Sequence, residues 1–375
     1  MMGEVVAGVS LAVWAYLALG HGRFWAPPRL PVAGAPPAVW PAVVAVVPAR
    51  DEADVLPRTL PTLLTQSYPG PFRVVVVDDD SADGTGEQAA MLGAEVVKSC
   101  GPPPGWAGKV AAMAAGVEAA GEPEFLLFTD ADIGFPPWAL TGLVRAAITH
   151  RLDLVSQMVR LRTESVWERL VVPAFVYFFA QLYPFARVNG PGRIAAAAGG
   201  CMLVRRSALE AAGGLEGIRA ARIDDVALAG LLKQRGRIWL GLAAATESVR
   251  AYPRLADLWQ MVARSAYVQL RHSPALLAAT AIGMLLVYAV PPAAAVAGLV
   301  VLDPLLAALG LLAWLTMSAT FVPMLRFHRV GAWRAPLLPA VALLYLVMTL
   351  DSARRHYAGR GGLWKGRVEP PTLRA

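Results

Sequence analysis

The chain has 375 residues, of which 56% are hydrophobic and 16% are charged. This composition is too apolar for an ordinary soluble enzyme. Nearly all the acidic residues lie within residues 40–270, whereas residues 275–350 are almost free of them, so we expect a polar domain followed by a membrane region.

The formal net charge of +7 raises the question of nucleic-acid binding, but no zinc-finger, helix-turn-helix or RNA-binding pattern is present. The basic residues gather near the apolar segments and towards the C-terminus, which favours contact with an anionic membrane surface and no nucleic-acid partner. Cys100 and Cys201 provide neither a disulfide framework nor a metal quartet, which is typical of a cytosolic protein.

The N-terminal segment, residues 1–22, is predicted to be a membrane anchor. The apolar run from Val5 to Gly20 follows Met-Met-Gly-Glu instead of a basic leader, so we expect it to be retained, although it is short for a full span. Arg23 and Arg29 come next, and by the positive-inside rule they place the following domain in the cytoplasm. Residues 23–41, rich in Pro, Ala and Gly, are predicted to be a linker.

Residues 42–250 alternate between strand-length apolar runs and helix-length amphipathic stretches. The strands are expected at Val43–Val47, Arg73–Val77, Glu95–Val97, Phe125–Phe128 and Leu154–Val159. The helices are expected at Val55–Thr65, Gly84–Leu92, Lys109–Ala119 and Pro137–Ile148. This alternation predicts an α/β fold with a mostly parallel sheet flanked by helices.

Acidic residues follow three of these strands. PARDE (48–52) follows the first run, DDDSADGT (78–85) the second, and TDAD (129–132) the run Phe125–Phe128. Ligands of such sheets bind at the carboxyl ends of the strands, so we expect these acids to share one rim. Within that rim, Asp130 and Asp132 are spaced to reach one hard cation, Mg²⁺ or Mn²⁺, whose remaining ligands would be water and substrate phosphate.

Asp78, Asp79 and Asp80 cannot all bind one ion without strong mutual repulsion. We expect one of them to accept hydrogen bonds from a nucleoside and another to brace the loop. Asp83 is a plausible N-cap for the helix that follows.

Two further segments carry candidate site residues. Lys109, in GWAGK, lies near a predicted helix N-terminus, where it can meet phosphate charge. Asp224 and Asp225 open another helix; one acid suffices as a cap, so the second could act as a general base. Just upstream, AGGCM (198–202) is a small-residue turn into a strand, suited to a wall against which a substrate lies.

The C-terminal third is predicted to be associated with the membrane. Residues 251–274 form an interfacial amphipathic segment, 275–351 a transmembrane region and 352–375 a basic cytoplasmic tail. Two to four membrane segments are expected, from Leu276–Val290, Ala293–Leu302, Pro304–Val322 and Leu337–Leu350. Arg326, Arg329 and Arg334 and the basic tail both favour the cytoplasm, so Leu337–Leu350 could re-enter, or an earlier segment could be split at Pro291-Pro292. The earlier run 166–185 fits either a core helix or an interfacial one.

The motifs VVPARDE, VVVVDDDSADGT, GWAGK, FTDADIGFPP, AAGGCMLVRR and IDDVALAGLLKQRG resemble, in order and spacing, those of family 2 glycosyltransferases with the GT-A nucleotide-diphospho-sugar transferase fold. The resemblance covers roughly residues 42–250. Within that family, the N-terminal anchor, GWAGK, MVARSAYVQLRHSP and RGGLWKGR are similar to hopanoid-biosynthesis-associated glycosyltransferases, and ceramide and carotenoid glucosyltransferases share the layout.

The resemblance implies a role for each rim residue. The base and ribose of a nucleotide sugar would be bound by Ala49, Asp51 and Glu52, with Asp79 pairing with the base and Asp80 or Asp78 supporting it. Asp132 would hold the metal on the diphosphate, with Asp130 nearby. Asp225, beside Asp224, would deprotonate the acceptor hydroxyl, which gives inversion by direct displacement.

The chain departs from the family pattern in two places. Asp224-Asp225 stands where Glu-Asp is frequent, which preserves the second acid. The Q-x-x-R-W pattern is replaced by QMVARS (260–265), so processive synthesis becomes doubtful, although Arg264 could still meet the diphosphate. The segment WKGR (364–367) fits either a phosphate contact or a membrane-surface contact.

The resemblance thus predicts a multi-pass inner-membrane enzyme whose catalytic domain lies in the cytoplasm. It would transfer a sugar from a nucleoside diphosphate, expected to be UDP, to the hydroxyl of a hopanoid or similar lipid. Transfer to a polyprenyl phosphate and a non-catalytic scaffold role in lipid synthesis are the alternatives. A transporter is disfavoured, because the apolar segments contain too few polar residues to line a pathway.

Overall fold

The computed structural model describes residues 1–31, 34–359, 363–364 and 367–368. The chain forms two compact units. The first, here the helical unit, comprises Met1–Pro27, Thr163–Ala186 and Tyr252–Gly362. The second, here the sheet unit, comprises Pro28–Arg162, Arg187–Ala251 and Leu363–Ala375.

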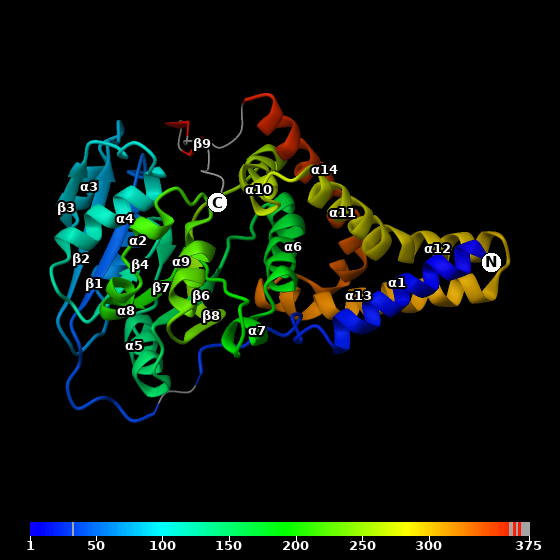
Figure 1. Ribbon diagram of the computed structural model, residues 1–375, viewed down its shortest axis with the longest axis horizontal. Helices are drawn as coiled ribbons and strands as arrows, with labels where there is room; N and C mark the ends of the chain where they lie inside the picture. Colours follow the sequence, from blue (N-terminus) through cyan, green and yellow to red (C-terminus); the bar gives the residue numbers. More distant parts are fainter. Residues whose placement is uncertain (32–33, 360–362, 365–366, 369–375) are drawn as a thin grey trace. The chain divides into compact units, whose positions relative to one another are not determined.

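The sheet unit is built on an eight-stranded sheet with the order β3-β2-β1-β4-β7-β6-β8-β5 (Figure 1). Its strands are β1 Val43–Ala49, β2 Phe72–Asp79, β3 Glu95–Ser99, β4 Phe125–Phe128, β5 Ile133–Gly134, β6 Leu154–Arg160, β7 Met202–Arg205 and β8 Ile238–Ser248. The pairs β1–β2, β1–β4, β2–β3 and β6–β8 are parallel, whereas β7 is antiparallel to β4 and β6, and β5 is antiparallel to β8. The α/β prediction is confirmed, and the antiparallel β7 and β5 make the sheet mixed.

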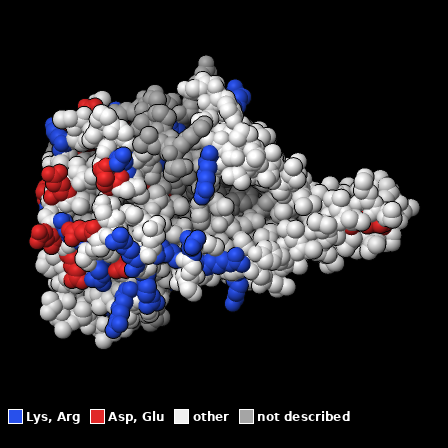
Figure 2. All heavy atoms as spheres, viewed as in Figure 1, with Lys and Arg blue, Asp and Glu red and all other residues white. Residues whose placement is uncertain are grey.

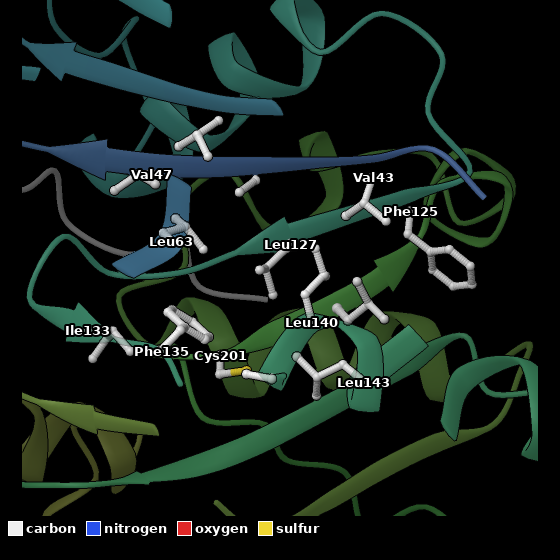
Figure 3. Packing of buried hydrophobic residues seen from close by; sticks show 14 of the residues in the cluster. Val43, Val47, Leu63, Phe125, Leu127, Ile133, Phe135, Leu140, Leu143 and Cys201 are labelled. Carbon is white, nitrogen blue, oxygen red and sulfur yellow. The ribbon is translucent and has the colours of Figure 1, made fainter. Parts of the chain in front are cut away.

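Helices cover both faces of this sheet. They are α2 Leu56–Leu64, α3 Thr85–Met91, α4 Gly108–Ala119, α5 Ala139–His150, α8 Arg206–Ala211, η1 Glu216–Ile218 and α9 Asp224–Lys233, and the short α7, Phe185–Asn189, follows α6. Successive strand residues point to opposite faces. Val43 and Val47 of β1 accordingly pack with Leu63 of α2 and Leu140 of α5 in one core cluster (Figure 3).

The opposite face of the sheet is covered by α4. Gly116 of this helix lies so close to Val46 that an added Cβ would come within 2.2 Å of the valine Cγ1. The close approach of α4 to β1 and β2 therefore depends on a residue without a side chain at this position.

The helical unit contains the apolar helices. They are α1 Met2–Leu19, α6 Val166–Leu182, α10 Leu255–Gln269, α11 Pro274–Met284, η2 Leu285–Ala289, α12 Val290–Val300, α13 Pro304–Phe327, η3 Ala332–Leu337 and α14 Leu338–Tyr357. Four helical stretches of the described chain are long and apolar enough to cross a membrane: Met2–Leu19, Pro274–Val300, Pro304–Phe327 and Ala332–Tyr357.

Three of these stretches pack side by side as α1, α12 and α13 (Figure 1). Gly298 of α12 faces the backbone of Ala307, and Gly310 of α13 faces the backbone of Ala295, so both contacts bring main chains together. Small residues allow this close packing between apolar helices. The face of α12 and α13 seen in Figure 2 is almost free of charged atoms, as a lipid-facing surface requires.

The helix that contains Pro291-Pro292 is not split at that dipeptide. It passes from α11 to α12 through the π-turn η2, in which the Val290 N–H bonds to the Leu285 carbonyl. Proline has no N–H, so the carbonyls of Leu286 and Val287 lose the backbone donors that residues 291 and 292 would supply. The N-terminal helix α1 supplies replacements: Ser10 donates to the Leu286 carbonyl at 2.8 Å, and the Trp14 indole donates to the Val287 carbonyl at 2.7 Å.

Helix α6 belongs to the helical unit, although it falls within the range 42–250 predicted for the catalytic domain. Its N-terminus is closed by a capping box between Ser165 and Glu168. Tyr177 is fully buried and bonds to Thr320 of α13 at 2.7 Å, while Tyr345 of α14 donates to the Val171 carbonyl at 3.0 Å. These contacts favour the core-helix interpretation, because an apolar helix buries itself against other apolar helices.

Candidate active site

The carboxyl ends of β1, β2 and β4 lie at one rim of the sheet, as predicted. Ala49 of β1 is level with Asp78 of β2, and Val46 is level with Phe128 of β4. Ala49 itself is buried. The acidic segments that follow these strands are therefore neighbours.

The first two segments are joined by hydrogen bonds. The Glu52 N–H donates to Thr85 Oγ1 at 2.8 Å, the Asp51 N–H donates to Ser81 Oγ at 3.1 Å, and Asp51 Oδ1 accepts from the Ala82 N–H at 2.9 Å. The backbone of Asp51 has a φ of 49°, a left-handed conformation that bends the chain at the rim. These hydrogen bonds hold the loops after β1 and β2 together, and the two loops form one wall of the rim.

The three aspartates at the end of β2, of which Asp78 and Asp79 close the strand and Asp80 follows it, differ in exposure. Asp79 has no exposed surface and lies 4.0 Å from Arg50, with Ser99 Oγ at 3.4 Å. Asp78 is also buried and accepts from the Ser81 N–H at 3.1 Å, whereas the Asp80 side chain is 65% exposed. In this geometry Asp78 and Asp79 brace the wall, and Asp80 faces solvent.

Asp83, the predicted N-cap, lies one residue before the observed N-cap. Gly84 is the N-cap of α3 and Asp83 precedes it, accepting from the Thr85 N–H at 3.0 Å and from the Ala53 N–H at 2.9 Å. The pKa of Asp83 is lowered, because these hydrogen bonds and that from the Thr85 hydroxyl outweigh partial burial, which acts in the opposite direction. Asp83 thus connects the loop after β1 with the first residue of α3.

The DAD turn, Asp130-Ala131-Asp132, follows β4. Asp132 is buried, accepts a hydrogen bond from the Ser248 hydroxyl, and lies 3.4 Å from the Arg250 guanidinium. The same guanidinium lies 2.7 Å from Glu52. Arg250 therefore links two acids that the sequence assigned to different parts of the pocket.

Lys109 joins the DAD turn to the start of α9. Its ammonium lies 2.8 Å from Asp130 and 3.1 Å from Asp224, and its side chain is 21% exposed. Burial lowers the pKa of Lys109, but the carboxylates of Asp130 and Asp224 outweigh it and raise the pKa overall. The lysine is therefore a fixed cation in this site.

Asp225 lies beside this ion pair. Its Oδ2 accepts from the Gly199 N–H at 2.9 Å, and its Oδ1 accepts from the Val226 N–H at 2.8 Å. Burial, and next the neighbouring charge of Asp224, raise the pKa of Asp225 to about 7, against the opposing effects of Lys109 and the two backbone hydrogen bonds. A carboxylate with a pKa near neutrality can accept a proton from a substrate.

Gly199 lies at the centre of these groups. A Cβ there would come within 3.0 Å of Lys109 Nζ, 3.5 Å of Asp225 Oδ2 and 3.8 Å of Asp130 Oδ2. The predicted small-residue wall is thus adjacent to the predicted base and the DAD turn.

The donor set of the DAD turn fits a hard divalent cation. Within residues 1–31, 34–359, 363–364 and 367–368, no group of three or more His, Cys, Asp or Glu side chains is arranged to hold a metal. Two carboxylates are nevertheless what Mg²⁺ or Mn²⁺ uses when water and substrate phosphates complete its shell.

Some predicted residues lie elsewhere, and some site residues were missed. Arg264 is on α10 in the helical unit, and the side chains of WKGR (364–367) lie outside the described set, so both predictions stay predictions.

Sequence reasoning missed Ser248 and Arg250, because no strand was expected at β8. A run of IWLGLAAA beginning at Ile238 was the available signal.

The chain resembles known proteins by a family model and by solved structures. Residues 44–213 match the family model described as Glycosyl transferase family 2. Comparison of the sequence with curated proteins gives no match.

Among solved structures, mannosyltransferase PcManGT from Pyrobaculum calidifontis, in complex with GDP-Man and Mn²⁺, has a TM-score of 0.53 and 19% identity over 96% of this chain and 99% of its own. Mannosyl-3-phosphoglycerate synthase from Rubrobacter xylanophilus has a TM-score of 0.38 and 22% identity, over 62% of this chain and 75% of its own. Glucosyl-3-phosphoglycerate synthase from Mycobacterium tuberculosis, in complex with phosphoglyceric acid, has a TM-score of 0.40 and 20% identity, over 62% and 79%.

The likeness to the first of these structures confirms the GT-A fold predicted for the chain. The match over residues 44–213 supports the predicted assignment to family 2 glycosyltransferases, and with it a nucleotide-sugar glycosyltransferase activity.

Proposed function

We propose that the protein is a membrane-bound, inverting glycosyltransferase that moves a sugar from a nucleoside diphosphate to a lipid hydroxyl, with a hopanoid or similar lipid as acceptor. One observation carries the proposal. A carboxylate with a pKa of about 7, Asp225, lies beside a fixed cation and a two-carboxylate turn that suits a metal.

The donor would lie along the rim formed by β1, β2 and β4. Asp51, Glu52 and the exposed Asp80 would contact the base and ribose, with a UDP-sugar as the expected donor. Asp79, assigned to the base by resemblance, is fully buried beside Arg50, so we propose that it orients Arg50 instead. Asp130 and Asp132 would hold Mg²⁺ or Mn²⁺, which neutralises charge on the leaving diphosphate. The complex of PcManGT with GDP-Man and Mn²⁺ supports a divalent metal.

Asp225 would act on the acceptor. Its carboxylate takes the proton of the lipid hydroxyl as the oxygen attacks the anomeric carbon, and the configuration inverts because displacement is direct. The backbone N–H groups of Gly199 and Val226 hold this carboxylate in one orientation. Lys109 lies 3.1 Å from Asp224. Burial, and next the negative charge of Asp224, raise the pKa of Asp225, which makes Asp225 a better proton acceptor.

The charges at the ends of α1 and α13 support a cytoplasmic catalytic side. These helices run parallel, since Gly3 of α1 lies against Leu306 of α13. At one end of the pair, Glu4 lies in the first turn of α1 and Asp303 is the N-cap of α13. At the other end, Arg23 follows α1 and Arg326 lies in the last turn of α13. By the positive-inside rule, the arginine end would face the cytoplasm of an inner-membrane protein.

We propose that α14 re-enters the membrane instead of crossing it. The Pro336 carbonyl, just before α14, accepts from the Trp314 indole at 3.0 Å, about 18 Å along α13 from Arg326 at 1.5 Å per residue. At the other end of α14, Tyr357 bonds to Tyr267 of α10 at 2.8 Å, close to the start of α11. Both ends of α14 would then be reached from the arginine side, which accounts for basic residues on either side of it.

Acceptor class can be tested directly. Purified protein is supplied with labelled UDP- and GDP-sugars and either lipid alcohols or polyprenyl phosphates. Transfer to the alcohols, lost in Asp225→Asn, supports the proposal. A polyprenyl phosphate is already anionic and needs no base, so efficient transfer to it that survives Asp225→Asn would establish the alternative. A protein that neither transfers nor hydrolyses any nucleotide sugar would fit the scaffold role.

A further inference from the structure

Each carboxylate of the DAD turn already lies against a basic side chain. Lys109 is 2.8 Å from Asp130, and Arg250 is 3.4 Å from Asp132. We propose that these two side chains are built-in counter-cations that make divalent-cation binding conditional on a nucleoside diphosphate. The inference rests on the proposed function, in which the DAD turn holds the metal.

Lys109 is fixed between two acids from different elements. It lies in the first turn of α4, and its ammonium also lies 3.1 Å from Asp224 at the start of α9. Its side chain is only 21% exposed, and moving the ammonium from Asp130 into bulk water would break its contact with Asp224 as well. A divalent cation that binds Asp130 must therefore come close to this ammonium or displace it.

A divalent cation that binds Asp132 must likewise come close to the Arg250 guanidinium or displace it. One carboxylate oxygen of Asp132 accepts from the Ser248 hydroxyl, and the other faces the Arg250 guanidinium. Arg250 is itself held by Glu52 at 2.7 Å, and the Val249 N–H donates to the Asp132 carbonyl at 2.9 Å. Both oxygens of Asp132 are thus engaged by the protein's own donors.

The electrostatic consequence follows from these contacts. Two positive side chains stabilise the carboxylates while the cation is absent, and they repel a cation that approaches the same oxygens. A nucleoside diphosphate brings negative charge that Lys109 and Arg250 can contact in place of the carboxylates. Cation and nucleotide should then strengthen each other's binding, and by linkage the gain is the same in either order.

In this account Lys109 and Arg250 are positioning residues: they act through Asp130 and Asp132. Variants of these two residues should show an uncommon effect, a gain in affinity. Loss of either basic side chain should increase the affinity for the bare cation, a change that mere damage to the fold would not produce.

The test measures Mn²⁺ binding to the purified full chain in detergent by electron paramagnetic resonance of free Mn²⁺. Wild type, Lys109→Met and Arg250→Met are compared without nucleotide and with UDP or GDP, after subtraction of Mn²⁺ bound to nucleotide in protein-free solution. Two controls remove the same charge elsewhere. Lys98→Met alters a side chain that is 74% exposed on β3, and Arg73→Met alters one that is 42% exposed at the start of β2, the end remote from the rim.

We expect nucleotide to tighten Mn²⁺ binding to wild type by at least about fivefold, the lower end of usual coupling between sites. Without nucleotide, Lys109→Met and Arg250→Met should each bind Mn²⁺ at least about fivefold more tightly than wild type. The controls and the charge-retaining Arg250→Lys should stay at the wild-type affinity, and unfolding temperatures verify that each variant is folded.

Two results would overturn the inference, and they differ in what else they reject. Nucleotide-promoted Mn²⁺ binding in wild type, with unchanged or weaker nucleotide-free affinity in both methionine variants, rejects the counter-cation role alone. Failure of wild type to bind Mn²⁺ even with UDP or GDP rejects the metal site of the proposed function as well.

Discussion

The N-terminal helix is expected to stabilise the helical unit by completing the hydrogen bonding of another helix. Pro291 and Pro292 leave the Leu286 and Val287 carbonyls without backbone donors, and Ser10 and Trp14 donate to them. The perturbations are Ser10→Ala and Trp14→Phe. The phenylalanine keeps an aromatic ring beside Tyr288, whose ring is 5.6 Å from that of Trp14, and removes the N–H.

The magnitude follows from the environment of these carbonyls. Ser10 and Trp14 both have 0% exposed surface, so water cannot replace the lost donor. An unsatisfied buried group costs about 1–3 kcal/mol. Hydrogen bonds between membrane helices average about 0.6 kcal/mol and reach about 1.7 kcal/mol. We therefore expect each variant to lose about 1 kcal/mol of unfolding free energy, and the double variant about 2 kcal/mol.

The assay is reversible unfolding in mixed micelles, with dodecyl sulfate titrated against a mild detergent and helicity followed by circular dichroism. Trp333→Phe is the matched control, because Trp333 is 70% exposed. If Ser10→Ala and Trp14→Phe unfold at the same detergent fraction as this control, the two carbonyls do not depend on α1 and the reasoning is refuted.

Three further predictions concern the sheet unit and its site. The base must be ionised, so kcat/KM for transfer to a hydroxyl should rise with pH through about 7 and then level off. In Asp224→Asn the midpoint should move to lower pH, because Asp224 raises the pKa of Asp225; an unchanged midpoint would contradict this cause. Gly116→Ala should lower the unfolding temperature, since overpacking against Val46 costs about 1–3 kcal/mol, whereas Gly230→Ala, with open space around it, should not; equal melting of both would refute the close contact.

Sequence patterns predicted the parallel part of the sheet because each of those strands can be recognised from its own residues. Val43–Val47 and Arg73–Val77 are continuous apolar runs, and the observed strands extend them only to Ala49 and Asp79. The acids after them fall on one rim because parallel strands end on the same side. This part of the site required no long-range information.

The remainder of the site depends on pairings that sequence does not reveal. Ser248 and Arg250 reach Asp132 because Ile133 of β5 pairs with Ser248 of β8. Lys109 was expected to meet phosphate, but α4 and α9 bring it between Asp130 and Asp224. Both contacts join segments more than 20 residues apart, so only the folded chain defines them.

The roles of individual acids also depended on the fold. The family resemblance assigned Asp79 to the base, but only the fold shows that this side chain is fully buried beside Arg50 and that Asp80 is the exposed member of the trio. Similarly, Val5–Gly20 was predicted to be an anchor. Its hydrogen bonds to the π-turn could not be foreseen, because they depend on the register between two apolar helices that are far apart in the sequence.

The most direct test of the proposed glycosyltransferase is mass analysis of lipid products. Purified protein is incubated with labelled UDP- and GDP-sugars, Mg²⁺ or Mn²⁺, and total membrane lipid, with Asp225→Asn treated in parallel. The account predicts a lipid heavier by one sugar residue, formed by wild type in the presence of metal and reduced by orders of magnitude in Asp225→Asn, which should still bind the nucleotide. Equal product from both proteins would contradict the role of Asp225, and the absence of any glycosylated lipid with every donor would contradict the proposed function.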